Sequence, residues 1–354
     1  MKMQKLAQRL DWHTVRKVKK GAITLTAVAL CLISFVRAQV PVPQQDDPPS
    51  SSLSRQLSDL QMEPARQAEI ERAIHVHDYA AAERVLLEEV ERDPKSPHSA
   101  KVLAIVAGVF FLDGQYANAV IAWKKAEAIA PLDERSRFTL AMACIKLNRR
   151  DWARPELEKL AAAQPQNPLF LYWLARLDYD ERNYNSAVAR LQKVIALDPK
   201  MARAYDTLGL CFDYLGKFDE AVKNYNQAVD LNRLLPKPSP WPHVDLAISL
   251  IALNQLADAE KNLREAIGYD SRLPQARYQL GRVLEMQGAF QAAAESLKTA
   301  IALAPEYPEP HYLLGRIYHR LGNEPLSKAE IGRFQQLKKA SEGQAARATE
   351  LGPK

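Results

Sequence analysis

Three segments of the chain carry a tyrosine followed four residues later by an arginine. Residues four apart on a helix share one face, so each pair would form a single contact point on a helix. Tyr and Arg combine apolar area with directed hydrogen bonding and are enriched at the energetic centres of protein interfaces. They indicate partner recognition, although each Tyr could instead pack on a neighbouring element with its Arg stacked on it. The pairs are Tyr172/Arg176, Tyr278/Arg282 and Tyr312/Arg316.

Residues with the spacing of a catalytic or metal site are missing from the sequence. It contains no G-x-x-x-x-G-K-[ST] phosphate loop, no H-E-x-x-H, no G-x-S-x-G and no C-x-x-C. His75 and His77 would point away from each other on a helix, so we interpret them as surface residues. We therefore predict a protein that is not an enzyme and that holds no cofactor and no metal.

The excess of positive over negative charge is confined to the N-terminus of the chain. The sequence has 48 Lys and Arg against 42 Asp and Glu, a formal net charge of +6. Residues 1–38 hold eight of these cations and one acid, which leaves 40 cations and 41 acids elsewhere. Because no basic field remains outside the N-terminus, we expect no nucleic-acid partner.

Residues 1–38 have the organisation of a secretory signal peptide. A basic stretch ends at Lys20, an apolar run covers Gly21–Val36, and Val36-Arg37-Ala38 fits a cleavage site before Gln39. As a helix the apolar run would be about 24 Å long, shorter than a hydrocarbon core of about 30 Å. We predict a cleaved signal and a periplasmic or extracellular protein. The alternative is an uncleaved inner-membrane anchor with the chain facing the periplasm.

Residues 39–60 follow as a Pro- and Ser-rich stretch that includes "VPVPQQDDPPSSSLS", Val40–Ser54. It offers little apolar surface to bury, so we predict a disordered tether. The two remaining cysteines, Cys144 and Cys211, lie two repeats apart, which is too far for a disulfide. We interpret them as buried free thiols.

The rest of the chain repeats one pattern with a period of about 34 residues, which predicts a solenoid of stacked units. A clear copy is "AYDTLGLCFDYLGKFDEAVKNYNQAVDLN", Ala204–Asn232. In it, Gly216 ends a first helix, and Ala221 and Ala228 permit close packing of a second. The units fill residues 61–340. They start near Glu63, Ala100, Glu134, Pro168, Ala202, Pro240, Pro274 and Pro308.

The same residue types recur at fixed positions of these units. The fifth unit carries Leu208, Gly209, Phe212, Gly216, Phe218, Ala221, Tyr225 and Ala228, and the second carries Phe110, Gly114, Tyr116, Ala119, Trp123, Ala126 and Pro131. This pattern resembles the tetratricopeptide repeat family. The resemblance implies an all-α, right-handed superhelical α-solenoid of about eight helix-turn-helix units, whose first helices line a concave, ligand-binding face.

Some positions depart from the pattern. Pro155 lies inside the second helix of the third unit and should kink or delay it. Four extra residues within Leu234–Pro242 should interrupt the superhelix between the fifth and sixth units. After Gly322 we predict a capping helix that ends near Ala340 and a flexible tail over residues 341–354.

The exposed positions of the first helices supply the candidate partner-binding residues. We predict a non-catalytic scaffold of the cell envelope that binds a segment of a partner protein through them. Two alternatives remain open, a membrane-anchored assembly factor and an accessory subunit of an envelope enzyme complex. The candidates are Phe138, Tyr172, Arg176, Tyr179, Arg203, Asp206, Asp213, Tyr214, Trp241, Tyr278, Arg282, Tyr312, Arg316 and His319.

Overall fold

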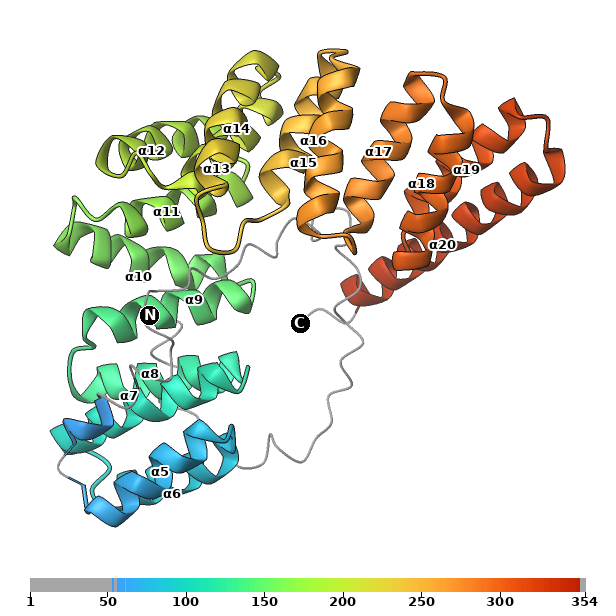
Figure 1. Cartoon of the computed structure of the whole chain (residues 1–354). Helices are drawn as coiled ribbons and strands as arrows, with labels where there is room; N and C mark the ends of the chain where they lie inside the picture. The colour runs from blue at the N-terminus through green and yellow to red at the C-terminus, as the bar shows by residue number, and fades with distance from the viewer. Residues whose placement is uncertain (1–52, 54–55, 61, 351–354) are drawn as a thin grey trace. The chain divides into compact units, whose positions relative to one another are not determined.

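The computed structural model describes residue 53, residues 56–60 and residues 62–350 of the chain. In these residues, every element of regular secondary structure is a helix (Figure 1). No helix of this part of the chain is both long and apolar enough to cross a membrane. The predicted export signal, its cleavage site and most of the predicted tether lie outside the described residues.

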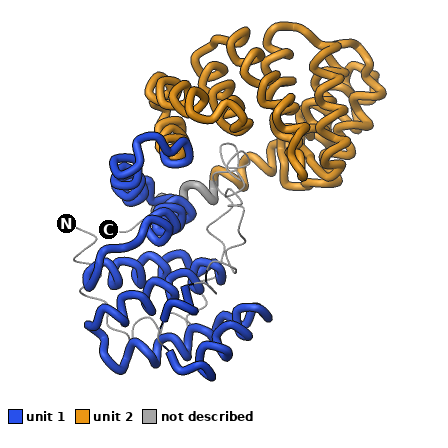
Figure 2. The backbone as a smooth tube through the Cα atoms, turned by 60° about the vertical axis from the view of Figure 1, so that its left-hand side comes forward, with its two compact units in different colours: residues 1–24, 35–170 blue, residues 25–34, 171–354 orange. Residues whose placement is uncertain are grey.

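The chain divides into two compact units, which Figure 2 shows in different colours; the described part of the first ends at Phe170, and the second continues from Leu171. The helices of the first unit are α5 (Pro64–His75), α6 (Tyr79–Arg92), α7 (Pro97–Leu112), α8 (Tyr116–Ile129), α9 (Glu134–Lys146) and α10 (Arg150–Ala163). Helix α11 (Pro168–Asp180) spans the division. The second unit continues with α12 (Tyr184–Leu197), α13 (Ala202–Tyr214), α14 (Phe218–Asn232), α15 (Trp241–Ala252), α16 (Leu256–Tyr269), α17 (Pro274–Met286), α18 (Phe290–Leu303), α19 (Pro308–Arg320) and α20 (Glu324–Glu350).

Within each unit, consecutive helices pack against each other in chain order. The odd-numbered helices are the first helices of the repeats, and they also contact one another. In the first unit α7 contacts α9, and in the second α13, α15, α17 and α19 follow one another in contact. This packing is that of an α-solenoid, so the predicted all-α solenoid of paired helices is confirmed.

The turn between the two helices of each repeat has a common geometry. Eight residues in the described part of the chain have a positive φ, and each follows one of the predicted repeat starts at the same offset. A left-handed residue ends a helix, and glycine adopts it without a Cβ penalty. The turns therefore confirm the predicted repeat register. The residues are His77, Gly114, Asn148, Arg182, Gly216, Asn254, Gly288 and Gly322.

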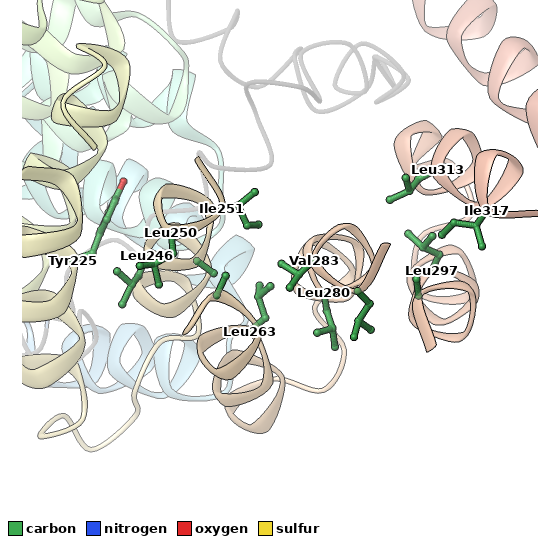
Figure 3. Close-up of a cluster of buried hydrophobic side chains, with 14 of the residues drawn as sticks. Tyr225, Leu246, Leu250, Ile251, Leu263, Leu280, Val283, Leu297, Leu313 and Ile317 are labelled. Carbon is green, nitrogen blue, oxygen red and sulfur yellow. The ribbon is translucent and has the colours of Figure 1, made fainter. Parts of the chain in front are cut away.

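One buried cluster joins the fifth to eighth repeats, all in the second unit. Figure 3 shows part of it, from Tyr225 on α14 through Leu250 on α15 and Leu280 on α17 to Ile317 on α19. Because side chains before and after residues 234–242 belong to the same cluster, the extra residues do not interrupt the packing. The predicted interruption at this loop is therefore wrong.

The loop at residues 234–242 is closed by the side chain of Asn232. Its Nδ2 donates a hydrogen bond of 2.8 Å to the Ser239 carbonyl oxygen, and its Oδ1 accepts one of 2.9 Å from the Ser239 amide. The Asn232 side chain is buried. These two bonds hold the ends of the loop together, so the chain enters α15 in register despite the extra length.

Pro155 lies inside α10 without delaying it, since the helix starts at Arg150 and continues to Ala163. Proline lacks the N–H that would bond to the carbonyl of Asp151. Both Pro155 and Asp151 are exposed, so water can take the place of that bond. The predicted delay of this helix is therefore wrong.

Both ends of the repeat array extend further than expected. Helix α20 continues to Glu350, beyond the predicted end at Ala340. At the other end, Leu53, Leu57 and Leu60 belong to the predicted disordered tether, yet all three are buried. A Cβ added to Gly108 on α7 would lie only 2.7 Å from Leu53 Cδ2, so Leu53 packs directly on this glycine. The end of the predicted tether is therefore part of the fold.

Candidate partner-binding surface

Two of the predicted binding residues, Phe138 and Tyr172, are buried at 6% and 1% exposure. The Phe138 ring packs on Phe170, with ring centroids 5.7 Å apart. The Arg203 guanidinium lies 4.7 Å from the Tyr172 ring centroid, and the Tyr172 hydroxyl is 3.4 Å from Thr207 Oγ1. The expectation that Phe138 and Tyr172 are exposed is wrong, because each packs on the first helix of the next repeat.

Arg176 is also buried, and it belongs to an aromatic cluster of the second unit. Its guanidinium lies 4.9 Å from the Tyr179 ring centroid and 3.4 Å from Asp180 Oδ1. Tyr184 and Tyr214 stack with centroids 4.9 Å apart, and Tyr179 packs edge-on against both rings. Tyr214 keeps 54% of its surface exposed. The predicted exposure is therefore wrong for Arg176, whereas Tyr214 offers an accessible ring.

Four further candidates, Arg203, Asp206, Asp213 and Trp241, are half-buried. Asp213 accepts hydrogen bonds from the Tyr225 hydroxyl at 2.8 Å and from the Ser249 hydroxyl at 2.6 Å. Trp241 packs against a small buried cluster at α15–α17 that contains Leu273. Burial lowers the pKa of Arg203. The role of these residues in binding stays a prediction.

Helix α19 carries several exposed predicted residues, and α17 carries a Tyr/Arg pair that is half-buried. We define the Arg–Tyr surface as Tyr278 and Arg282 on α17 together with Tyr312, Arg316 and Arg320 on α19. Tyr312 is 44% exposed, and the side chains of Arg316 and Arg320 are 44% and 51% exposed. The two Tyr/Arg pairs are one repeat apart in the sequence, so they occupy equivalent positions on α17 and α19. These two helices are in contact.

A single carboxylate lies among the arginines of this surface. Oε1 of Glu285, on α17, is 3.0 Å from Arg316 Nη2 and 4.0 Å from Arg320 Nε. The Glu285 side chain is only 9% exposed. A buried carboxylate beneath two exposed guanidinium groups holds them in place without covering them.

The tyrosines of the Arg–Tyr surface are held by neighbouring rings. Tyr278 packs edge-on against Tyr307 with centroids 5.4 Å apart, and Tyr312 packs on Phe334 of α20 at 5.2 Å. Burial raises the pKa of Tyr278 and of Tyr307. The hydroxyl of Tyr278 is therefore protonated at neutral pH and can donate a hydrogen bond.

His319 and Arg320 also lie on α19, close to Arg316 in the sequence. His319 is exposed, and its Nδ1 contacts Glu324 Oε1. Arg320 was not among the binding residues predicted from the sequence, because no Tyr lies four residues before it. Its position four residues after Arg316, on the same helical face, is the signal that could have found it.

The first unit contains a buried ionic network that the sequence analysis did not identify. Glu156 on α10 is 3% exposed, and it accepts hydrogen bonds of 2.7 Å from Lys124 on α8 and 2.6 Å from Arg137 on α9. Both cations also bond to Glu127. Burial alone would raise the pKa of Glu156 and Glu127, but these hydrogen bonds and charges outweigh it, so both pKa values are lowered. The network joins three helices and is structural.

Family models match several segments of the chain. Residues 244–308 and 284–349 each match a model described as tetratricopeptide repeat, and residues 155–228 match one described as anaphase-promoting complex, cyclosome, subunit 3. Anaphase-promoting complex subunit 3 of Dictyostelium discoideum is 32% identical over 78 residues. The match covers 22% of this chain and 8% of that protein, so the chain corresponds to a small part of its length.

Solved structures share the fold at low sequence identity. A tetratricopeptide repeat protein from Parabacteroides merdae has a TM-score of 0.56 at 16% identity, over 76% of this chain and 98% of that chain. PilW, a type IV pilus biogenesis factor, has a TM-score of 0.54 at 18% identity, over 60% and 97% of the two chains. These likenesses show a shared fold alone. The family models and the eight common turns, which recur at the predicted period, show that the chain contains tetratricopeptide repeats.

Proposed function

We propose that this protein is a non-catalytic scaffold that binds a segment of a partner protein on the first helices of its second unit. The observation that carries the proposal is the Arg–Tyr surface. Tyr312, Arg316 and Arg320 on α19 are exposed and Tyr278 and Arg282 on α17 are half-buried, whereas the equivalent pair Tyr172/Arg176 is buried in packing. Tyr and Arg are the types that supply most binding energy in protein interfaces.

The packing of the second unit supports recognition by a preformed surface. The core cluster includes side chains from α13 to α19, so the helices that carry Tyr278 and Tyr312 are fixed before a partner arrives. Association then costs less conformational entropy than binding to a mobile segment would. A rigid face of this kind suits an extended chain that spans neighbouring repeats.

Crosslinking in the native cells tests the scaffold function. A photo-crosslinking residue placed at Met286, an exposed position on α17, should capture a partner polypeptide. The capture should disappear when Tyr278, Arg282, Tyr312 and Arg316 are changed together to Ala. The matched control is Lys261→Ala with Arg264→Ala on the exposed surface of α16, which should leave it unchanged. Equal capture by the wild type and the fourfold variant would contradict the proposal.

We also propose that the protein acts in the cell envelope after export. The support is the basic and apolar organisation of residues 1–38 with its cleavage pattern at Val36-Arg37-Ala38. N-terminal sequencing of the protein from cell fractions tests it. A mature start at Gln39 in the periplasmic fraction is expected. An intact N-terminus in the membrane fraction would indicate the anchored form, and a cytoplasmic location would contradict export.

A further inference from the structure

We infer that the partner segment held by the Arg–Tyr surface is acidic and extended, with two carboxylates about three residues apart. The inference rests on the proposed function and adds the chemical class and spacing of the ligand. It follows from three observations on α17 and α19. These are the excess of guanidinium groups, the hydrogen-bond donors that stay accessible, and the repeat distance between equivalent arginines.

The charges on this face do not balance. Arg282, Arg316 and Arg320 are opposed there by Glu285, whose side chain is almost fully buried. The nearby Glu309 lies 3.8 Å from Lys338, and Glu324 contacts His319, so each of these acids already has a basic partner. The surface therefore keeps a net positive charge that a partner carboxylate would neutralise.

The guanidinium groups of Arg316 and Arg320 also have N–H donors that Glu285 does not use. Arg316 and Arg320 both approach the same Oε1 atom of Glu285. A guanidinium has five N–H donors, so one shared oxygen leaves most of them unused by Glu285, and the Arg316 and Arg320 side chains are 44% and 51% exposed. Arg282 donates from Nη1 to Gln279 Oε1 at 2.6 Å, a neutral acceptor that leaves its charge uncompensated. Guanidinium groups bind carboxylates through paired, charge-assisted hydrogen bonds, which makes carboxylate the matching ligand group.

The repeat geometry sets the spacing of the ligand groups. Arg282 and Arg316 occupy equivalent positions on first helices that pack side by side. Packed helices are about 8–10 Å apart, and a polyproline II chain advances about 3.1 Å per residue. Two carboxylates three residues apart in such a chain would therefore each face one arginine. The adjacent tyrosines would contact the intervening residues.

The fifth and sixth repeats have no arginine at the position equivalent to Arg282, so Arg282 and Arg316 are the two arginines of this kind on neighbouring first helices. The residue equivalent to Arg282 is Ile248 on α15 and Leu210 on α13. Leu210 is buried, and Ile248 packs against the small cluster around Val244. The surface therefore matches a pair of carboxylates near one end of the unit, and a uniformly acidic segment would gain no further contact of this kind.

Fluorescence anisotropy with synthetic peptides tests the inference. The probe is a labelled peptide with Glu at every third position and Pro between, which favours the polyproline II conformation. One comparison peptide has the same composition with its Glu residues adjacent, and another has Lys in place of Glu. The purified chain should bind the spaced Glu peptide about tenfold more tightly than either, and binding should weaken with salt. Equal affinity for the three peptides would overturn the inference.

Charge reversal assigns the binding to this surface. Arg282→Glu and Arg316→Glu should each weaken binding of the spaced peptide by about tenfold or more. Arg264→Glu, at an exposed position on α16, is the matched control and should have no such effect. Arg316→Gln removes the charge with less risk to the fold, and circular dichroism checks that the variants stay helical. Unchanged affinity in folded Arg282→Glu and Arg316→Glu chains would overturn the inference.

Two further outcomes separate the ligand class from the proposed function. If a single-stranded oligonucleotide of equal charge bound Arg282 and Arg316 more tightly than the peptide, the ligand would be a nucleic acid and the inference would be wrong. If no peptide bound but crosslinking from Met286 still captured a partner, the acidic specificity would fail and the scaffold function would stand. If no peptide bound and crosslinking from Met286 captured no partner, both proposals would be wrong.

Discussion

The Tyr225 hydroxyl donates a hydrogen bond of 2.8 Å to Oδ2 of Asp213, which links the two helices of the fifth repeat. The other carboxylate oxygen of Asp213 accepts a hydrogen bond of 2.6 Å from Ser249 on α15, in the sixth repeat. One side chain therefore joins three helices. Asp213 lies on the predicted binding face, yet its carboxylate holds consecutive repeats together.

Removal of this carboxylate should destabilise the second unit. Asp213→Ala leaves two hydroxyl donors without their acceptor, and we expect the free energy of unfolding to fall by about 1–3 kcal/mol. Urea unfolding followed by circular dichroism measures the change. Asn226→Ala, at an exposed position on α14, is the control and should change little. A stable Asp213→Ala chain with weakened partner capture would instead assign Asp213 to binding.

The close contact between α13 and α14 makes Gly209 sensitive to substitution. A Cβ at Gly209 would lie 2.6 Å from Cε1 of Tyr225, whose ring is fixed by its hydrogen bond to Asp213. Gly209→Ala should therefore lower the free energy of unfolding by about 1–3 kcal/mol. Gly268→Ala on α16 is the matched control, since its Cβ would meet nothing within 4 Å. It should raise stability by up to about 1 kcal/mol through helix propensity. Equal effects of the two substitutions would show that Tyr225 can move aside.

The network around Glu156 should make the first unit sensitive to acid. The pKa values of Glu156 and Glu127 are lowered below 4.5 in the folded chain, so their stabilising effect is present above that pH. It should be lost as the pH falls through the lowered values, because protonation removes the ion pairs. Glu156→Gln should cost about 3 kcal/mol at pH 7 and show a smaller further loss at pH 3. Urea titrations across this range measure both effects.

The control for the acid experiment is Glu158→Gln, an exposed residue on the same helix. It should keep the stability and the pH dependence of the wild type. If Glu156→Gln and Glu158→Gln behaved alike at both pH values, the buried network would not stabilise the fold.

The two buried cysteines should be chemically inert in the folded chain. Burial raises the pKa of Cys144 and of Cys211 to about 12, so few thiolates exist at pH 8. The thiolate is the reactive form. A Cys31→Ser chain should therefore release no chromophore from Ellman's reagent when folded, and should react at both thiols in urea. Rapid reaction of the folded chain would show that a thiol is accessible.

The sequence predicted the repeat register well because each turn depends on a local choice. Gly216 and Asn254 are residue types that adopt a left-handed turn, and their spacing alone places the helices. Whether the side chains of a Tyr/Arg pair are buried or exposed depends instead on the next repeat. Tyr172 is followed by Arg203 and Thr207, which cover it, whereas Tyr312 is followed by α20 and stays accessible.

The ionic network could not be predicted for a similar reason. Lys124, Arg137 and Glu156 lie on three helices, and nothing in their spacing distinguishes them from exposed charges. Their pairing follows from the packing of α8, α9 and α10. Local patterns of turn and helix are readable from one segment, but burial of a charged side chain requires knowing which helices meet.

The contact of Leu53 with Gly108 affects where a recombinant version of this protein should begin. A chain trimmed to start at Glu63, the first repeat predicted from the sequence, would lose Leu53, Leu57 and Leu60 together. The apolar surface beneath them would then face water, and self-association would compete with partner binding. Expression of the folded protein should therefore retain the leucines, with the boundary placed before Leu53.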